Sequence, residues 1–180
     1  MPIVGTDLHY KLSVPSASAG GVTPQTDVNA SLGKWCSTTD LVDATLNNLF
    51  DDISGDENAA QESEYRCIFV YNAHATLTWQ NVVIWLSAEE QGGANISIGL
   101  DTTAASVYTS GTQQALVVAN EDTAPSGVSF SSPTTKATGL SIGNLAAGYV
   151  KAIWVKRTAT NSAAMANDSV TLKVEGETAA

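Results

Sequence analysis

The sequence predicts an all-β fold, a β-sandwich of immunoglobulin-like or jelly-roll type with one short helix near residues 40–53. Short runs of alternating apolar and polar residues recur at roughly ten-residue intervals, and turn residues separate them. Charged residues make up only 14% of the chain, so its polar surface consists largely of Ser, Thr, Asn and Gln. Such a neutral, Thr-rich surface suits exposed strand faces better than exposed helix faces.

The strand predictions rest on alternation and on β-branched and aromatic content. The predicted strands comprise residues 9–14, 65–71, 76–79, 82–87, 95–100, 116–119, 128–130, 149–157 and 169–175. Strand 65–71 carries apolar residues on both faces, so we expect it to be covered on both sides. Residues 76–79 and 82–87 are expected to pair through a turn at Gln80 and Asn81. In the last strand, the alternation places three residues inward: Val170, Leu172 and Val174.

The single predicted helix covers residues 40–53. Asp40 can cap its first turn, and Asp43 three residues later completes an approximate capping box. Four apolar residues fall on one face at helical spacing: Val42, Leu46, Leu49 and Ile53. We expect Gly55 to end this helix.

The predicted domain organisation is one β-sandwich over residues 31–180, preceded by an N-terminal strand and an extended arm within residues 1–30. The arm, residues 15–30, is rich in Ser, Ala, Gly, Pro and Asn, and it has no apolar pattern that could form a core. Two interpretations of the arm stay open, an interaction element and a plain surface segment.

The charge of the chain excludes several classes of partner. Eight basic and 18 acidic residues give a net charge of −10, so we predict no binding to nucleic acid or to membranes. The acidic residues concentrate in a stretch without a basic residue: Asp40, Asp43, Asp51, Asp52, Asp56, Glu57, Glu62 and Glu64. This stretch is expected to be solvated, with a docking surface for a basic partner or a cation site as the alternatives. Its central acids could offer oxygen ligands for Ca²⁺, but their spacing does not match the EF-hand pattern; they are Asp51, Asp52, Asp56 and Glu57.

The sequence also indicates where the chain is assembled. Residues 1–4 lack the basic start and apolar run of a signal peptide, and no stretch approaches the roughly 18 apolar residues of a membrane span. We therefore expect assembly in the cytoplasm. In that compartment Cys36 and Cys67 are expected to be free, buried thiols rather than a disulfide.

Candidate catalytic residues are few. Residues 139–143 (GLSIG) match the G-x-S-x-G nucleophile elbow, but that motif requires a strand, a sharp turn and a helix, with a His after the Ser. Both histidines, His9 and His74, precede Ser141, so we predict a β-turn region at 139–143 instead. His74 is predicted to be a turn residue rather than a base or a metal ligand. We therefore predict no enzyme activity, no catalytic, cofactor-binding or metal-binding residue, and no cofactor.

The aromatic residues allow two interpretations. Trp79, Trp85, Trp154 and Tyr149 could line a sugar-binding face, as in a carbohydrate-binding module. Trp85 and Trp154 stand among apolar strand residues, which favours core packing.

Eight segments of the chain resemble a family of tailed-bacteriophage and prophage structural proteins. They are residues 29–33 (NASLG), 48–52 (NLFDD), 64–67 (EYRC), 74–78 (HATLT), 98–101 (IGLD), 124–128 (APSGV), 152–157 (AIWVKR) and 174–176 (VEG). The resemblance covers most of the chain from about residue 25 onward. It carries no catalytic residues over to this chain.

What this resemblance implies is a non-enzymatic virion protein, a decoration (cement) protein that binds the outside of the capsid and stabilises the head. The implied partner is the major capsid protein, and the implied oligomer is a homotrimer. The chain would then be located on the capsid exterior after assembly in the host cytoplasm. Two alternatives stay open, a neck or tail component in low copy number and a carbohydrate-binding module.

Overall fold

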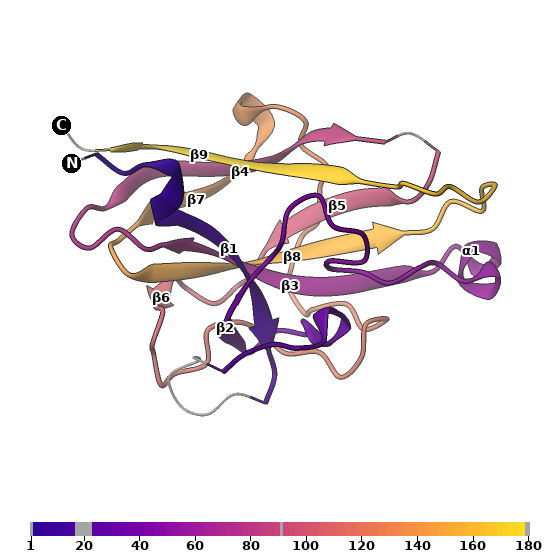
Figure 1. Ribbon diagram of the computed structural model, residues 1–180, viewed down its shortest axis with the longest axis horizontal. Helices are drawn as coiled ribbons and strands as arrows, with labels where there is room; N and C mark the ends of the chain where they lie inside the picture. Colours follow the sequence, from indigo (N-terminus) through magenta and orange to yellow (C-terminus); the bar gives the residue numbers. More distant parts are fainter. Residues whose placement is uncertain (1, 17–22, 91, 179–180) are drawn as a thin grey trace.

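The computed structural model describes residues 2–16, 23–90 and 92–178. Its strands are β1 Leu8–Val14, β2 Trp35–Asp40, β3 Ser63–Asn72, β4 Trp79–Glu89, β5 Asn95–Leu100, β6 Ser106–Val107, β7 Leu140–Leu145, β8 Tyr149–Thr158 and β9 Val170–Thr178. Its helices are α1 Gly55–Ala60 and the 3-10 helices η1 Gly5–Asp7, η2 Val28–Ala30 and η3 Lys136–Thr138. The strands form two antiparallel sheets that pack face to face, which confirms the predicted all-β, sandwich-like fold (Figure 1).

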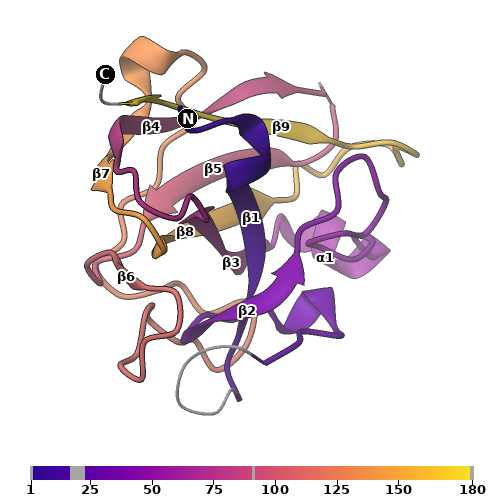
Figure 2. The same ribbon diagram turned by 60° about the vertical axis from the view of Figure 1, so that its left-hand side comes forward.

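The two sheets differ in size. The larger has six strands in the order β2-β1-β3-β8-β5, with β6 pairing to the beginning of β8. The smaller has three strands in the order β7-β4-β9. Figure 2 shows β1 beside β2, with which it pairs at one side of the larger sheet.

The main core lies between the two sheets. It is formed by fully buried apolar residues from both: Leu12, Ile68, Val70, Val82, Ile84, Leu86, Leu145 and Ile153. Burying one such side chain contributes roughly 1.5–3 kcal/mol, so this layer supplies much of the stability. The three residues predicted to face inward from β9 pack against this core, while Thr171 and Lys173 between them are exposed, as the alternation predicts.

A second core lies on the outer face of the larger sheet. Cys67, Phe69 and Trp154 are fully buried there, beneath the long segment 101–133. The prediction that strand 65–71 is covered on both sides is therefore confirmed. Asp101 holds the covering segment in place, because its carboxylate accepts hydrogen bonds from Trp154 Nε1 at 2.7 Å and from the Leu116 backbone N–H at 2.9 Å.

The predicted helix at residues 40–53 is wrong in position. Asp40 is the last residue of β2, and residues 41–54 form a loop in which Ala44 and Asn47 both have a φ of 53°. The helix α1 begins at Gly55 instead, directly after the predicted span. Its capping box uses Ser54 rather than Asp40.

The physical reason is that the apolar residues in this loop do not share one buried face. Leu49 is buried in the main core and Phe50 packs against it, whereas Val42 and Leu46 are exposed. Tertiary packing of Leu49 and Phe50 therefore outweighs the weak helix signal of the segment, which also contains the poor helix former Asn47.

Some strand predictions also differ from the structure. Residues 79–89 form one continuous strand rather than two paired strands, and Asn81 sits in a bulge with a φ of 51° where the turn was predicted. Residues 116–119 and 128–130 lie in the covering segment outside regular strands. Residues 139–143, predicted to be a turn, largely belong to β7. The strands β2, β6 and β7 lacked the strong alternation that the prediction needed.

The N-terminal region is built into the sandwich. β1 lies between β2 and β3, so the larger sheet contains a strand from before the predicted boundary at residue 30. Residues 17–22 of the predicted arm lie outside the described residues. Its end, residues 23–30, follows the outer edge of β2, where Thr38 donates its N–H to the Thr23 carbonyl. Gln25 is buried, and its Nε2 donates to the Ser13 carbonyl oxygen at 2.8 Å.

Candidate functional site

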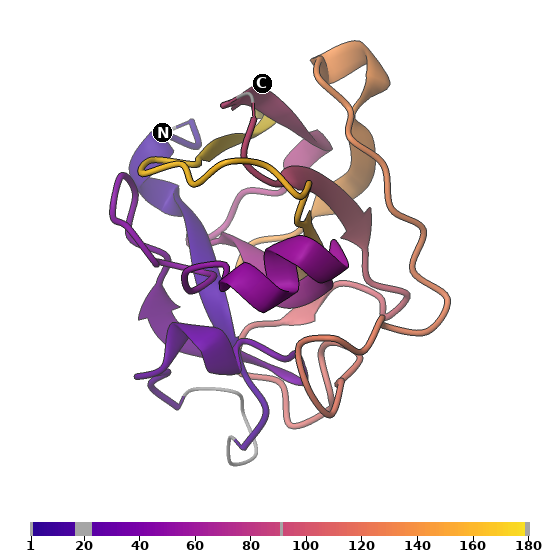
Figure 3. The same cartoon turned by 90° about the vertical axis from the view of Figure 1, so that its right-hand side faces the viewer.

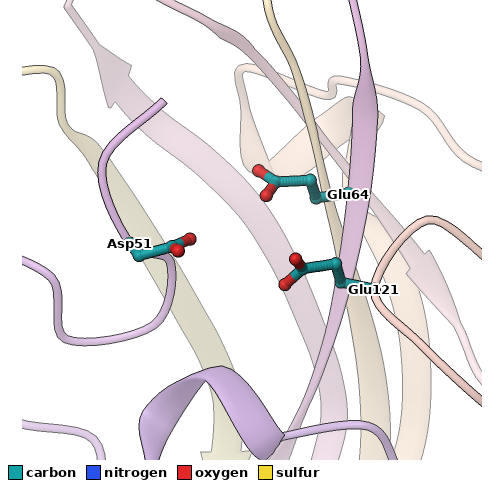
Figure 4. A group of neighbouring side chains, drawn as sticks. All are labelled: Asp51, Glu64 and Glu121. Atoms are coloured by element: carbon teal, nitrogen blue, oxygen red, sulfur yellow. The ribbon is translucent and has the colours of Figure 1, made fainter. Parts of the chain in front are cut away.

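Five charged side chains meet where β3 begins and β8 ends. The carboxylates of Asp51, Glu64 and Glu121 each offer an oxygen within 4.8 Å of the others, and Figure 4 shows them pointing toward one another. They come from the loop 41–54, from β3 and from the covering segment. Arg66 of β3 and Arg157 of β8 lie among them. We refer to these five residues as the charge cluster.

Arg157 and Glu64 form the buried centre of the charge cluster. They are directly opposite in the β3–β8 pairing, and Arg157 Nε donates to the Glu64 carboxylate at 2.6 Å. The second contact joins Arg157 Nη2 to the same carboxylate oxygen. Arg157 Nη2 also lies 3.6 Å from Asp51 Oδ1. This cross-strand pair therefore ties the loop 41–54 to the sheet.

Arg66 ties in the covering segment. Its side chain is fully buried, and its Nη2 donates to the Glu121 carboxylate while lying 3.9 Å from Asp51 Oδ1. The Phe50 ring lies 5.3 Å from the Arg66 guanidinium carbon and 4.7 Å from that of Arg157. Both cations thus gain an aromatic contact in addition to their ion pairs.

This geometry bears on the cation site that the acidic stretch suggested. Of the central acids only Asp51 reaches the charge cluster, and Glu57 instead caps α1 by accepting the Ser54 N–H at 2.6 Å. Each of the three clustered carboxylates already faces a guanidinium group. Three negative and two positive charges leave a formal charge of −1, so the cluster is a nearly balanced ion-pair network.

Opposing effects act on the buried acid. Burial raises the pKa of Glu64 above its usual value, and the charge and hydrogen bonds of Arg157 act in the opposite direction without cancelling the effect. Arg157 therefore favours the ionised form of Glu64, against the effect of burial. The sequence contained a signal for this cluster, because charged residues inside the apolar strands 65–71 and 149–157 require buried partners.

The residues singled out for catalysis do not assemble. Ser141 is exposed within β7, which lacks the strand–turn–helix geometry of a nucleophile elbow. His74 Nδ1 accepts the backbone N–H groups of Thr76 at 3.1 Å and Leu77 at 3.0 Å. This confirms that His74 is a turn residue, located between β3 and β4.

Most of the aromatic residues considered for a sugar-binding face are buried. Trp154 lies in the second core, as the core-packing interpretation predicted, and Trp79 lies in the main core. Trp85 is buried but belongs to neither core, and Tyr149 is half-buried. Lys173 lies over the Trp85 ring at 5.5 Å from its centroid, which closes the outer face of the smaller sheet at that point.

The two cysteines are buried and unpaired with each other, as predicted. Burial is the main cause of the raised pKa of the Cys67 thiol, so it stays protonated and unreactive.

A groove of about 1200 Å³ opens at the same end of the sandwich as the charge cluster. One wall is the loop 41–54, and the other is formed by residues 162–172, which lead into and include the start of β9. Figure 3 shows this end, where both segments flank α1. Leu46 on one wall is 70% exposed and Met165 on the other is 42% exposed. We refer to this feature as the end groove.

Comparisons with known proteins add no relative, because no family model, curated protein or solved structure matches the chain. Within residues 2–16, 23–90 and 92–178, no helix has the length and apolar character needed to cross a membrane.

Proposed function

We propose that this chain is a non-enzymatic structural protein of a tailed-phage virion, most specifically a decoration protein that binds the outside of the head. The observation that carries the proposal is the resemblance of eight segments to such proteins. Three of these segments supply four of the five residues of the charge cluster: residues 48–52 provide Asp51, residues 64–67 provide Glu64 and Arg66, and residues 152–157 provide Arg157.

Other resembling segments also pack on each other. Gly99 lies against the backbone of Ser129 and the side chain of Val128, so that a Cβ at position 99 would approach them to 2.8 and 2.5 Å. A Cβ on Gly33 would lie 3.1 Å from the ring of Trp154, which belongs to another of these segments. The resemblance therefore concerns residues that build this scaffold, and it supports a shared architecture used for a structural role.

The physical properties of the chain suit this role. A net charge of −10 disfavours contact with packaged DNA and leaves binding to protein surfaces. Two packed cores make a rigid unit whose loops are held in place, as a protein that clamps neighbouring subunits requires. We propose the major capsid protein as partner and a homotrimer as the bound form, because head-to-tail contacts close into rings at three-fold positions.

The test is the copy number of the chain in purified phage particles, measured by quantitative mass spectrometry against the major capsid protein. A number of the same order as that of the capsid protein supports the decoration role. A handful of copies per particle would move the chain to the neck or tail, and its absence from particles would overturn the virion proposal.

A matched test uses heads that lack the chain. Such heads should lose their DNA at lower temperature, and adding the purified chain back should restore the original release temperature. Release that is unaffected by the chain would contradict a stabilising role.

A further inference from the structure

The end groove combines exposed apolar side chains with unpaired backbone. Leu46 and Met165 are exposed to solvent on opposite walls of the groove. Large exposed apolar side chains that face each other are characteristic of contact sites. The loop that presents Leu46 also holds Ala44 at a φ of 53°, a left-handed conformation that alanine seldom adopts. This loop conformation therefore carries backbone strain at Ala44.

The wall opposite the loop includes a free strand edge. β9 is an edge strand that pairs only with β4 among the described strands, and its first residues, 170–172, line the end groove. Figures 1 and 2 show the loop 41–54 beside this part of β9. An unpaired edge offers a row of N–H and C=O groups to an added strand.

The edges of the larger sheet offer no comparable site over their described lengths. The outer edge of β2 is covered by residues 23–25, since Thr38 bonds to Thr23. β5 is covered by Ser131, which exchanges two backbone hydrogen bonds with Ile98. Among the described strands, only those of the smaller sheet leave long edges open, and the start of β9 is where an edge, a groove and exposed apolar residues coincide.

The charge of the end groove indicates which kind of partner it binds. Four carboxylates line it: Asp43, Asp51, Asp52 and Asp168. The one cation among its described lining residues is Arg157, whose guanidinium is already engaged with Glu64 and Asp51. A negatively lined groove attracts Lys and Arg side chains. A second copy of this chain, with its net charge of −10, is electrostatically disfavoured there.

We propose that the end groove binds an extended, basic segment of a partner protein as an added strand along β9. Backbone hydrogen bonds to β9 supply the pairing, alternate Lys or Arg side chains meet the acidic lining, and an apolar side chain lies between Leu46 and Met165. The identity of the partner as a head protein rests on the proposed function. The preference of the groove for a basic, extended segment is argued from the groove alone.

The first experiment uses the full chain and two fluorescent peptides, one of alternating Lys and Val and one in which every Lys is replaced by Glu. Fluorescence anisotropy should show binding of the Lys peptide only, with affinity falling as salt is raised. The double variant Leu46→Lys, Met165→Lys removes both apolar side chains and places positive charge in the groove, so it should bind the Lys peptide at least about tenfold more weakly. The matched control is Val4→Lys, Val107→Lys, which makes the same charge change at exposed valines outside the groove and should bind like the wild type.

Several results would overturn the proposal. Equal affinity of the groove variant and the control variant, or of the Lys and Glu peptides, would show that the groove is not the binding site. Self-association that the groove variant abolishes in sedimentation would make a second copy the occupant. Far-UV circular dichroism and thermal melting of both variants establish that each is folded, so that lost binding reports on the surface.

A second experiment separates this inference from the proposed function. If the groove variant is incorporated into particles at the wild-type copy number while the Lys peptide fails to bind it, the decoration role stands and the groove is not the contact with the head. If the wild-type chain is absent from particles but binds the Lys peptide through the groove, the virion proposal fails and the groove assignment stands.

Discussion

Replacing Arg157 by Met should strongly destabilise the protein at neutral pH. The side chains of Arg157 and Glu64 are only 10% and 6% exposed, so the variant leaves the Glu64 carboxylate buried without its main partner. Methionine retains most of the apolar stem, which confines the change to the charge. Removing one member of a buried ion pair typically costs about 3–5 kcal/mol, a large share of the roughly 5–15 kcal/mol of a natural domain.

The reasoning also predicts a rescue. In the double variant Arg157→Met, Glu64→Leu both buried charges of this pair are removed, and Asp51, whose side chain is 49% exposed, keeps Arg66 as a neighbour at 3.9 Å. This variant should therefore unfold within about 1 kcal/mol of the wild type, or be more stable than it. As a control, Lys136→Met breaks an exposed pair with Glu175 and should change the stability by less than about 1 kcal/mol.

The stability should also depend on pH in a specific direction. Without Arg157, burial raises the pKa of Glu64 further, so folding favours its protonated form. A carboxyl group whose pKa is raised by folding contributes its full stabilisation at pH values below its unfolded pKa, which is about 4.3 for Glu. That contribution is lost as the pH rises through the pKa of the group in the folded protein. The cost of Arg157→Met, taken against the wild type at each pH, should therefore be smaller near pH 4 than at pH 7.

The assay is urea unfolding followed by the fluorescence of the buried tryptophans, because guanidinium salts would screen the charges. A cost below about 1 kcal/mol for Arg157→Met at pH 7, or a double variant no more stable than the single one, would refute the account of the charge cluster.

Three further predictions test the fold. Gly33→Ala should cost more than about 2 kcal/mol in urea unfolding, since Gly33 has a φ of 95° and no space for a Cβ. Asp101→Ala should lower the free energy of unfolding by about 2–4 kcal/mol, because the Trp154 indole N–H and the Leu116 backbone N–H lose their acceptor. In a double-mutant cycle, Trp154→Phe should cost less stability in the Asp101→Ala background than in the wild type. Cys36 and Cys67 should react with a thiol reagent only at the rate of protein opening, and rapid labelling in the native state would contradict their burial.

The local sequence pattern determined most of the strands of this protein and the faces that they bury. Alternation along β1, β5, β8 and β9 predicted strands that the structure contains, because the two faces of a strand are set by successive residues. The apolar content of both faces of strand 65–71 predicted that it lies between two cores, and turn chemistry around His74 predicted the end of that strand. These features depend on neighbours in sequence, which a sequence displays directly.

Only the tertiary structure decided the place of the helix, the charge cluster and the end groove. Residues 41–54 form a loop because Leu49 and Phe50 pack into a core formed by distant strands. Glu64 and Arg157 are 93 positions apart, and their pairing depends on the register of β3 with β8. The end groove likewise needs the start of β9 to lie beside a loop from the first third of the chain. Such contacts are set by packing over long sequence distances, which residue order in one segment does not specify.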